Sequence, residues 1–202
     1  LRFCESIRKR NYPLIKECLN AGANPYQKWN NEMNALQNAC VIGDERIVEI
    51  LLLEKIDPNN IPALTGFVPV RNITDPLMIA VSKNRKKIFD MLIDKNANFS
   101  KQRENSYSPL WNNLAEFILY HFKNSKQLDN TVEYYLKRMI QHGWDINQKN
   151  FIKGTPLWFA CNLNCNNIEV QKDLVRFLLK NGADPHNMPN PFYMRPVIRK
   201  II

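Results

Sequence analysis

The stretch that decides the fold is TPLWFACNLNCNNIEVQKDLVRFLLKNGADP, which runs from Thr155 to Pro185. Thr155 is a residue type that caps helix starts, and Pro156 suits the first helical position, where its missing N–H is not needed. Near the other end, Gly182 is able to adopt the left-handed conformation that ends a second helix. A pair of short helices cannot bury its own apolar face, so this unit predicts neighbours of the same kind.

Such neighbours are visible in the spacing of the closing tripeptide at residues 182–184. Degenerate copies stand at residues 22–24, 55–57, 96–98 and 143–145, at intervals of 33, 41, 47 and 39 residues. The distance from the start of a tripeptide to the opening leucine of the next unit is 14 residues before Leu36, Leu110 and Leu157, and 22 residues before Leu77. Because the same spacing recurs at independent places, we predict a tandem array in which insertions lengthen three of the units.

This pattern resembles the ankyrin repeat, whose first helix begins T-P-L-H-x-A and whose apolar second helix ends in G-A-D. The resemblance implies an all-α ankyrin-repeat solenoid of about five helix-turn-helix repeats, with insertions in repeats 3, 4 and 5. The predicted repeats form a single domain over residues 1–202 and occupy residues 1–25, 26–58, 59–100, 101–148 and 149–187. Residues 188–202 are predicted to be an irregular tail or the start of a truncated further repeat.

Two features depart from the family pattern. Trp111 and Trp158 stand where the signature has histidine, and they are predicted either to pack between repeats or to enlarge a partner-facing aromatic surface. The insertion in repeat 4 gives its first helix an apolar face at Phe117, Ile118 and Phe122, which follow helical spacing. We expect these three side chains to be mostly buried in a ridge that packs against the insertion in repeat 5.

Composition limits the classes of function. The chain has 202 residues, and no apolar run in it approaches the roughly 18 residues that a membrane-spanning helix needs. Five cysteines, an odd number without paired metal-ligand spacing, indicate a reducing, intracellular compartment, and Cys40 and Cys161 are predicted to be buried thiols. Phe3 already stands at the opening position of the first repeat, so we interpret the chain as an excised fragment without a visible secretory signal.

No catalytic constellation is visible in the sequence. His142 precedes Gly143 at the end of a predicted helix, where a cation suits the helix dipole, and neither His121 nor His186 is paired with a recognisable nucleophile. The six glycines are too scattered for a phosphate-binding loop. We therefore expect no enzyme activity, no cofactor and no metal within these residues.

The resemblance implies a partner protein docked on the concave face, which hairpin tips and inner helices form in this family. Carried over by register, the expected partner-binding residues are Trp29, Asn30 and Met33 in repeat 2; Arg71, Asn72, Thr74 and Lys83 in repeat 3; Glu104, Asn105 and Tyr107 in repeat 4; and Phe151 and Ile152 in repeat 5. Aromatic and methionine side chains are enriched in interface centres. Local packing of one hairpin against the next explains the same residues equally well.

A net charge of +9 leaves a second class of function open. Two basic groups fall at corresponding helix ends, Arg8, Lys9 and Arg10 in one repeat and Lys83, Arg85, Lys86 and Lys87 in another. They form either a basic edge for nucleic acid or an anionic surface, or a solvated edge without a ligand.

The insertion-rich repeats of this basic, asparagine-rich chain are similar to ankyrin-repeat effector proteins of intracellular bacterial pathogens, and poxviral ankyrin proteins are a second comparison. The bacterial resemblance implies a monomeric module that docks host proteins in the host cytosol or nucleus. A further alternative is that the chain is the ankyrin part of a larger enzyme.

Overall fold

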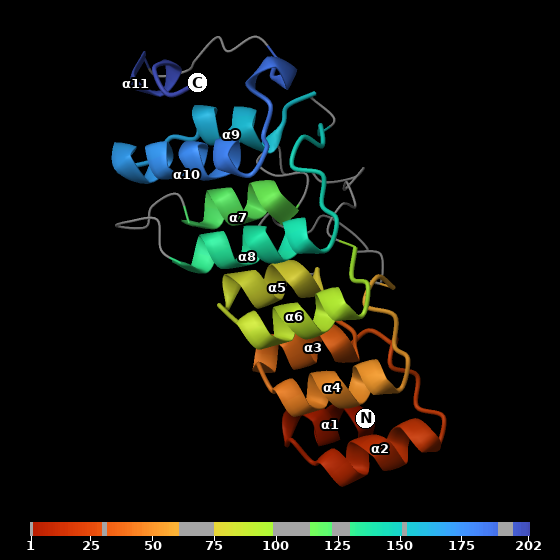
Figure 1. The fold of residues 1–202 in the computed structure, drawn as a ribbon. Coiled ribbons are helices and arrows are strands. Elements are labelled where there is room, and N and C mark those ends of the chain that lie inside the picture. The colour runs from red at the N-terminus through yellow and green to blue at the C-terminus, as the bar shows by residue number, and fades with distance from the viewer. Residues whose placement is uncertain are drawn as a thin grey trace. The chain divides into compact units, whose positions relative to one another are not determined.

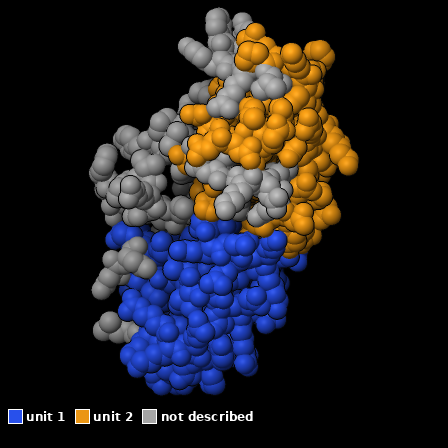
Figure 2. Space-filling model, turned by 90° about the vertical axis from the view of Figure 1, so that its left-hand side faces the viewer, with its two compact units in different colours: residues 1–98 blue, residues 99–202 orange. Residues whose placement is uncertain are grey.

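The computed structural model describes residues 2–29, 32–60, 75–98, 114–122, 130–150, 153–189 and 196–202. Every regular element within these ranges is a helix, so the predicted all-α fold is confirmed for this part of the chain. The chain divides into two compact units, unit 1 with residues 1–98 and unit 2 with residues 99–202 (Figure 2). Each unit is described by itself.

Unit 1 contains three helix pairs that follow one another along the chain. The pairs are α1 (Arg2–Arg8) with α2 (Tyr12–Asn20), α3 (Ala35–Ile42) with α4 (Glu45–Leu53), and α5 (Pro76–Ser82) with α6 (Lys86–Asp94). The inner helices α1, α3 and α5 contact one another in succession, and the outer helices α2, α4 and α6 do the same (Figure 1). Ile7, Leu51 and Phe89 are fully buried, because each pair covers the apolar face of the next.

Short polar side chains set where these helices begin. The Asn11 and Asp44 side chains accept hydrogen bonds from the first-turn N–H groups of α2 and α4 at 3.1 and 3.2 Å, and Asp75 does the same for α5. Asn34 and Gln37 form a reciprocal capping box at the start of α3. These contacts satisfy N–H groups that have no partner inside a helix.

The five positions predicted to close the repeats behave alike. We call Gly22, Lys55, Asn96, Gly143 and Gly182 the closing residues, and all five have positive φ, at 84°, 58°, 58°, 83° and 95°. After each one, the next N–H donates to the carbonyl five residues back, as Ala183 does to Leu178 at 3.0 Å. This is the hydrogen bond of a left-handed helix end, and it confirms the register that the sequence predicts.

At three described positions, the fourth residue after a closing residue bonds to the loop that ends the next helix pair. The Tyr26 hydroxyl accepts the Asp57 N–H at 2.9 Å. Asn59 accepts the Asn98 N–H at 2.6 Å and donates to the Asn96 carbonyl at 3.0 Å. In unit 2, Asn147 accepts the Asp184 N–H at 2.8 Å and donates to the Gly182 carbonyl at 3.0 Å. In these three described loops, one side chain therefore fixes the register between neighbouring helix pairs.

Unit 2 contains two further helix pairs and a short C-terminal helix. The pairs are α7 (Leu114–Phe122) with α8 (Asn130–Gln141) and α9 (Pro156–Asn162) with α10 (Ile168–Lys180), followed by the 3-10 helix η1 (Pro185–Asn187) and α11 (Pro196–Arg199). α7 contacts α9, and the Lys137 ammonium of α8 lies 5.7 Å from the Phe177 ring centroid of α10. The two pairs are therefore in contact through both layers.

The predictions for the insertion in repeat 4 are answered in part. Phe117 and Ile118 are buried as predicted, with 2% and 0% of their surface exposed. The side chain of Phe122 and the opening residues Leu110 and Trp111 lie outside the described residues. The packing of this helix against the insertion in repeat 5 stays a prediction.

The insertion in repeat 5 is held by a buried glutamine. Thr155 caps α9 as predicted, by accepting the Trp158 N–H at 3.2 Å. At the other end of α9, Gln171 reaches back from α10, and its Nε2 lies 3.0, 3.0 and 2.9 Å from the carbonyl oxygens of Ala160, Cys161 and Leu163. These carbonyls belong to the end of a helix, where they have no intrahelical partner. Gln171 therefore closes the helix at the point where the extra residues begin.

The cysteines agree with the predicted packing. Cys40 and Cys161 are buried, with 0% and 1% exposed surface, and all five thiols are free. Burial raises the pKa of Cys161 to about 12 and that of Cys40 well above its usual range. Within the described part of the chain, no helix is long and apolar enough to cross a membrane.

Candidate functional site

The structure describes three of the twelve predicted partner-binding residues. Trp29, Met33 and Lys83 lie in the described ranges, whereas the other nine lie outside them, namely Asn30, Arg71, Asn72, Thr74, Glu104, Asn105, Tyr107, Phe151 and Ile152. Trp29 and Met33 come together across one turn. Lys83 stands apart from them, at the end of α5, where its side chain is exposed.

The chain turns sharply between Trp29 and Met33. The Trp29 N–H donates to the Met33 carbonyl at 3.0 Å, and the Glu32 N–H donates to the Trp29 carbonyl at 2.9 Å. Glu32 takes up the left-handed conformation, with φ of 60°, and its carboxylate pairs with Lys28 at 2.9 Å. These bonds fix the two ends of a tight hairpin turn.

The same turn recurs in unit 2 between Asn150 and Gly154. The Asn150 N–H donates to the Gly154 carbonyl at 2.9 Å, the Lys153 N–H donates to the Asn150 carbonyl at 3.0 Å, and Lys153 has φ of 60°. Both turns begin seven residues after a closing residue, at Trp29 and at Asn150. Of the predicted partner-binding positions, Trp29 and Met33 therefore lie at the ends of a hydrogen-bonding pattern that recurs in unit 2.

Each turn has a different anchor at its first residue. Asn150 is 6% exposed and donates from Nδ2 to the buried Glu116 carboxylate of α7 at 2.7 Å, while its Oδ1 accepts the Gly154 N–H at 2.9 Å. Trp29 is 8% exposed, and the Arg8 guanidinium lies 5.4 Å from its ring centroid. Such a cation–π contact stabilises the aromatic ring against the inner helix. Both anchors tie a hairpin to an inner helix.

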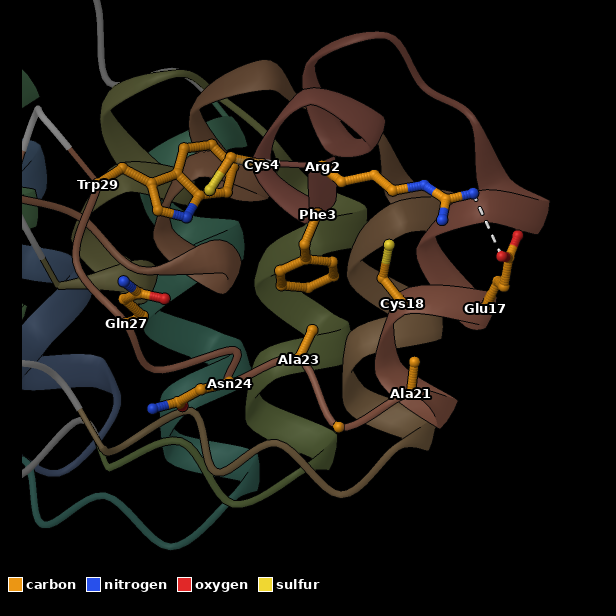
Figure 3. Close-up of a pocket in the computed structure, with 11 residues that line it drawn as sticks. Arg2, Phe3, Cys4, Glu17, Cys18, Ala21, Ala23, Asn24, Gln27 and Trp29 are labelled. Carbon is orange, nitrogen blue, oxygen red and sulfur yellow. Dashed lines mark hydrogen bonds and ion pairs between the residues drawn. The ribbon is translucent and has the colours of Figure 1, made fainter.

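A pocket opens beside Trp29 at the face of the first helix pair. Its volume is about 340 Å³. Phe3 lies between Trp29 on one side and Cys18 on the other, with Ala23 beside it (Figure 3). Arg2 and Glu17 form an ion pair at 3.2 Å at the rim. Partial burial raises the pKa of the Cys4 thiol, which also lines the pocket, so this thiol is protonated at neutral pH.

The predicted basic edge is partly neutralised by carboxylates. The ion pairs are Lys9–Glu5 at 2.7 Å, Arg10–Asp44 at 3.5 Å and Lys87–Glu45 at 2.7 Å. Tyr12 adds to this network, because its hydroxyl donates to Asp44 at 3.1 Å and its ring lies 4.4 Å from the Arg46 guanidinium. These contacts reduce the positive potential that an anionic ligand would meet.

Sequence reasoning missed the pocket and the bond between Asn150 and Glu116. The register could have found Asn150, since it stands at the same distance from its closing residue as Trp29, but only Phe151 and Ile152 were predicted there. Its partner Glu116 lies 34 positions away on another helix, and no local pattern joins the two. Among the described residues, no group of three or more histidine, cysteine or acidic side chains is arranged to hold a metal ion.

Comparison with known proteins gives two matches to family models. The model described as ankyrin repeats in three copies matches residues 3–111, and the model described as ankyrin repeat matches residues 154–191. No curated protein has a significant match to the sequence.

Solved structures show the same fold at low sequence identity. The human ASB11 ankyrin repeat domain has a TM-score of 0.53 and 20% identity, with 91% of this chain and 70% of that chain covered. A chain in the structure of the predatory endopeptidase Bd0816 from Bdellovibrio bacteriovorus in complex with the immunity protein Bd3460 has a TM-score of 0.61 and 17% identity. That match covers 94% of this chain and 85% of the other. The predicted ankyrin-repeat solenoid fold is confirmed by these matches.

Proposed function

Because the chain belongs to the ankyrin-repeat family, we propose that it is a docking module whose protein partner binds the hairpin turns and the inner helices. Ankyrin repeats generally mediate protein–protein interaction and are typically not enzymes. The observation that carries the proposal is the pair of anchored hairpins, Trp29–Met33 and Asn150–Gly154, which have the same backbone hydrogen bonds. Hydrogen bonds that hold the two ends of a turn in place before binding reduce the conformational entropy lost on binding.

The proposed contact residues are the twelve carried over by register. Met33 is partly exposed next to the Trp29 anchor, and Lys83 is exposed at the end of α5. Trp29 is mostly buried, so its part in this proposal is to hold the hairpin and to offer one edge of its ring. The remaining nine residues enter through their positions in the register.

A finer proposal concerns the setting in which the module acts. We propose that it is the ankyrin part of a bacterial effector that docks a host protein in the host cytosol or nucleus. The five free cysteines, four of them buried, fit a reducing compartment. Because the solved structures have low sequence identity to the chain, they do not support this proposal about its setting. Its support comes from composition and from the degenerate, insertion-rich repeats.

A binding experiment with matched variants tests the docking surface. Proteins captured from host-cell lysate by the full chain are identified, and the affinity of each purified protein is measured for the chain and for Met33→Ala/Phe151→Ala. Residues at the centre of an interface contribute about 2 kcal/mol or more each, so the loss of two is expected to weaken binding by about 4 kcal/mol, which is several hundredfold. The control is Leu53→Ala, because Leu53 is 63% exposed on the outer helix α4.

The expected result is weakened binding of the hairpin variant with unchanged binding of the control. If both variants bind every saturable partner with equal affinity, the interface does not lie at the hairpins. Failure to recover any saturable partner at micromolar concentration would argue against the docking function itself.

Nucleic acid or an anionic surface is the alternative ligand, through the exposed basic residues. Lys83 is exposed and has no ion-pair partner among the described residues, whereas Arg10 and Lys87 are paired. This alternative predicts affinity that falls steeply with salt. A titration with duplex DNA, RNA and acidic vesicles at two salt concentrations tests it, and absence of binding at low salt removes it.

A further inference from the structure

Among the described residues, two copies of one recognition unit bind an asparagine side chain, and at a third copy the Asp57 N–H donates to the Tyr26 hydroxyl. The unit consists of the carbonyl of a closing residue and the N–H two residues later. Asn59 binds the Asn96 carbonyl and the Asn98 N–H at 3.0 and 2.6 Å. Asn147 binds the Gly182 carbonyl and the Asp184 N–H at 3.0 and 2.8 Å. The carboxamide suits this unit because one group supplies both a donor and an acceptor.

The first helix pair presents the same unit without an occupant. Gly22 is the closing residue there, with φ of 84°, as in the other repeats. Among the described residues, neither the Gly22 carbonyl nor the Asn24 N–H has a hydrogen-bond partner. Both residues are exposed, so the donor and the acceptor are open to a ligand.

The apolar surface beside this unit is also incompletely covered. Ala23 follows the closing residue and is partly exposed. The residues at the same position in the other repeats are only 5% to 6% exposed, namely Ile56, Ala97, Trp144 and Ala183. Ala23 lines the pocket of about 340 Å³ together with Phe3, Cys18 and Trp29 (Figure 3). The free polar unit and the pocket therefore share one face of the first helix pair.

We propose that this face is a docking surface for one more helix pair of the same repeat type, whose loop places an asparagine carboxamide between Gly22 and Asn24. The evidence is its identity in register with the two occupied units, each of which joins the loops of two successive helix pairs. This inference does not depend on the proposed function, because it rests on the hydrogen-bonding groups of Gly22 and Asn24, although Trp29 belongs to both surfaces.

A second copy of the chain does not fit this face as well as such a helix pair. The residue four positions after the closing residue Gly182 is His186. His186 carries its donor and its acceptor on two ring nitrogens, whereas Asn59 and Asn147 present the oxygen and the nitrogen of one carboxamide to the occupied units. The last repeat therefore does not offer the side chain that the open unit of the first repeat is shaped to bind.

A fusion to the full chain tests the proposal. Residues 35–59 followed by residues 27–33 are joined ahead of Leu1, which adds the α3–α4 helix pair and keeps 14 residues between its closing residue and Phe3. In this fusion the copy of Asn59 stands where it reaches Gly22 and Asn24. The readouts are amide hydrogen exchange of Asn24 and the urea midpoint of unfolding. The expected result is at least tenfold slower exchange of Asn24 and a higher midpoint.

Two matched variants make the result specific. Changing the copied Asn59 to alanine is expected to bring the Asn24 exchange rate most of the way back to that of the unfused chain. Changing it to aspartate retains the acceptor, so the Asn24 amide is expected to stay partly protected. In the unfused chain, Asn59→Ala shows how much faster the Asn98 amide exchanges without its side-chain acceptor, and this sets the size of the effect expected at Asn24. Slow exchange that persists in the alanine fusion would show that the carboxamide is not the recognised group and would overturn the proposal.

Three further outcomes also overturn the proposal. The first is an appended helix pair that stays unfolded while Asn24 exchanges at its original rate. The second is strong protection of Asn24 in the dilute unfused chain, which would mean that the unit is already occupied. The third is protection of Asn24 that rises with concentration of the unfused chain together with dimer formation in sedimentation, which would identify a second copy as the occupant.

Discussion

Gln171→Leu is expected to destabilise unit 2, because Gln171 is the side chain that donates to the Ala160 and Cys161 carbonyls at the end of α9 (Pro156–Asn162). The side chain has no exposed surface, and its Nε2 lies 2.9 to 3.0 Å from three main-chain carbonyl oxygens, those of Ala160, Cys161 and Leu163. Leucine has a similar size and no donor. The substitution therefore changes the hydrogen bonding of these carbonyls with little change in volume.

The magnitude follows from the two N–H bonds of the amide. Each buried carbonyl that loses its partner costs about 1 to 3 kcal/mol, so two lost donors cost about 2 to 6 kcal/mol. Part of this cost is offset, because the Gln171 Oε1 is itself buried without a partner among the described residues and because leucine gains about 1 to 2 kcal/mol from burial. The expected net loss is about 2 to 3 kcal/mol.

Urea unfolding measured by circular dichroism checks this value, with amide exchange of α9 and α10 as a local readout. The chain has two compact units, so the local readout assigns the effect to unit 2. Gln141→Leu is the control, because Gln141 is exposed at the end of α8, and a change within about 0.5 kcal/mol is expected there. If Gln171→Leu also stays within about 0.5 kcal/mol, the proposed role of Gln171 is refuted.

Three other substitutions or treatments have defined outcomes. Gly43→Ala is expected to cost about 1 to 2 kcal/mol, because φ is 74° and a methyl group would meet the Arg85 guanidinium at 2.5 Å. Gly182→Ala is the matched comparison, because Gly182 also has positive φ but lies in open space, and it should cost about 1 kcal/mol. If the Gly43→Ala variant and the unmodified chain have equal urea midpoints, the cost expected for Gly43→Ala is contradicted. Asn150→Ala removes the donor to the buried Glu116 carboxylate and should lower the free energy of unfolding by about 3 kcal/mol, whereas Asn147→Ala should lower it by about 1 kcal/mol. Similar losses of stability in the two variants would show that the bond to Glu116 is unimportant. Iodoacetamide at pH 8 should alkylate Cys4 well before Cys161, since burial raises the Cys161 pKa to about 12 and leaves little thiolate. Peptide mass spectrometry measures the labelling, and equal labelling of the two cysteines would contradict this prediction.

The part of the fold that the sequence predicts is the part that depends on local chemistry. The closing residues were found from degenerate copies of one tripeptide and their spacing, and even Lys55 and Asn96 have positive φ, although they are not glycine. Thr155 caps α9 because its role requires only the next turn of the helix. Such features are set by neighbours in the chain, so a register carries them from one repeat to the next.

The features that escaped prediction depend on contacts between distant residues. Gln171 reads as one polar residue on an amphipathic helix, and its three carbonyl partners become evident only when α10 packs on α9. Trp29 was expected at a hairpin tip, but Arg8 from the preceding inner helix covers its ring. The pocket beside it arises from surface that no other repeat covers in the described part of the chain, and no sequence pattern encodes that.

Amide hydrogen exchange of the unmodified chain tests the central claim most directly. The claim is that repeats are joined by one side chain per loop, which binds the N–H two positions after the next closing residue. The Asp57, Asn98 and Asp184 amides donate to such side chains, whereas the Asn24 amide has no partner among the described residues. The account predicts that these three amides exchange at least tenfold more slowly than Asn24. Exchange of Asn98 and Asp184 as fast as that of Asn24 would contradict it.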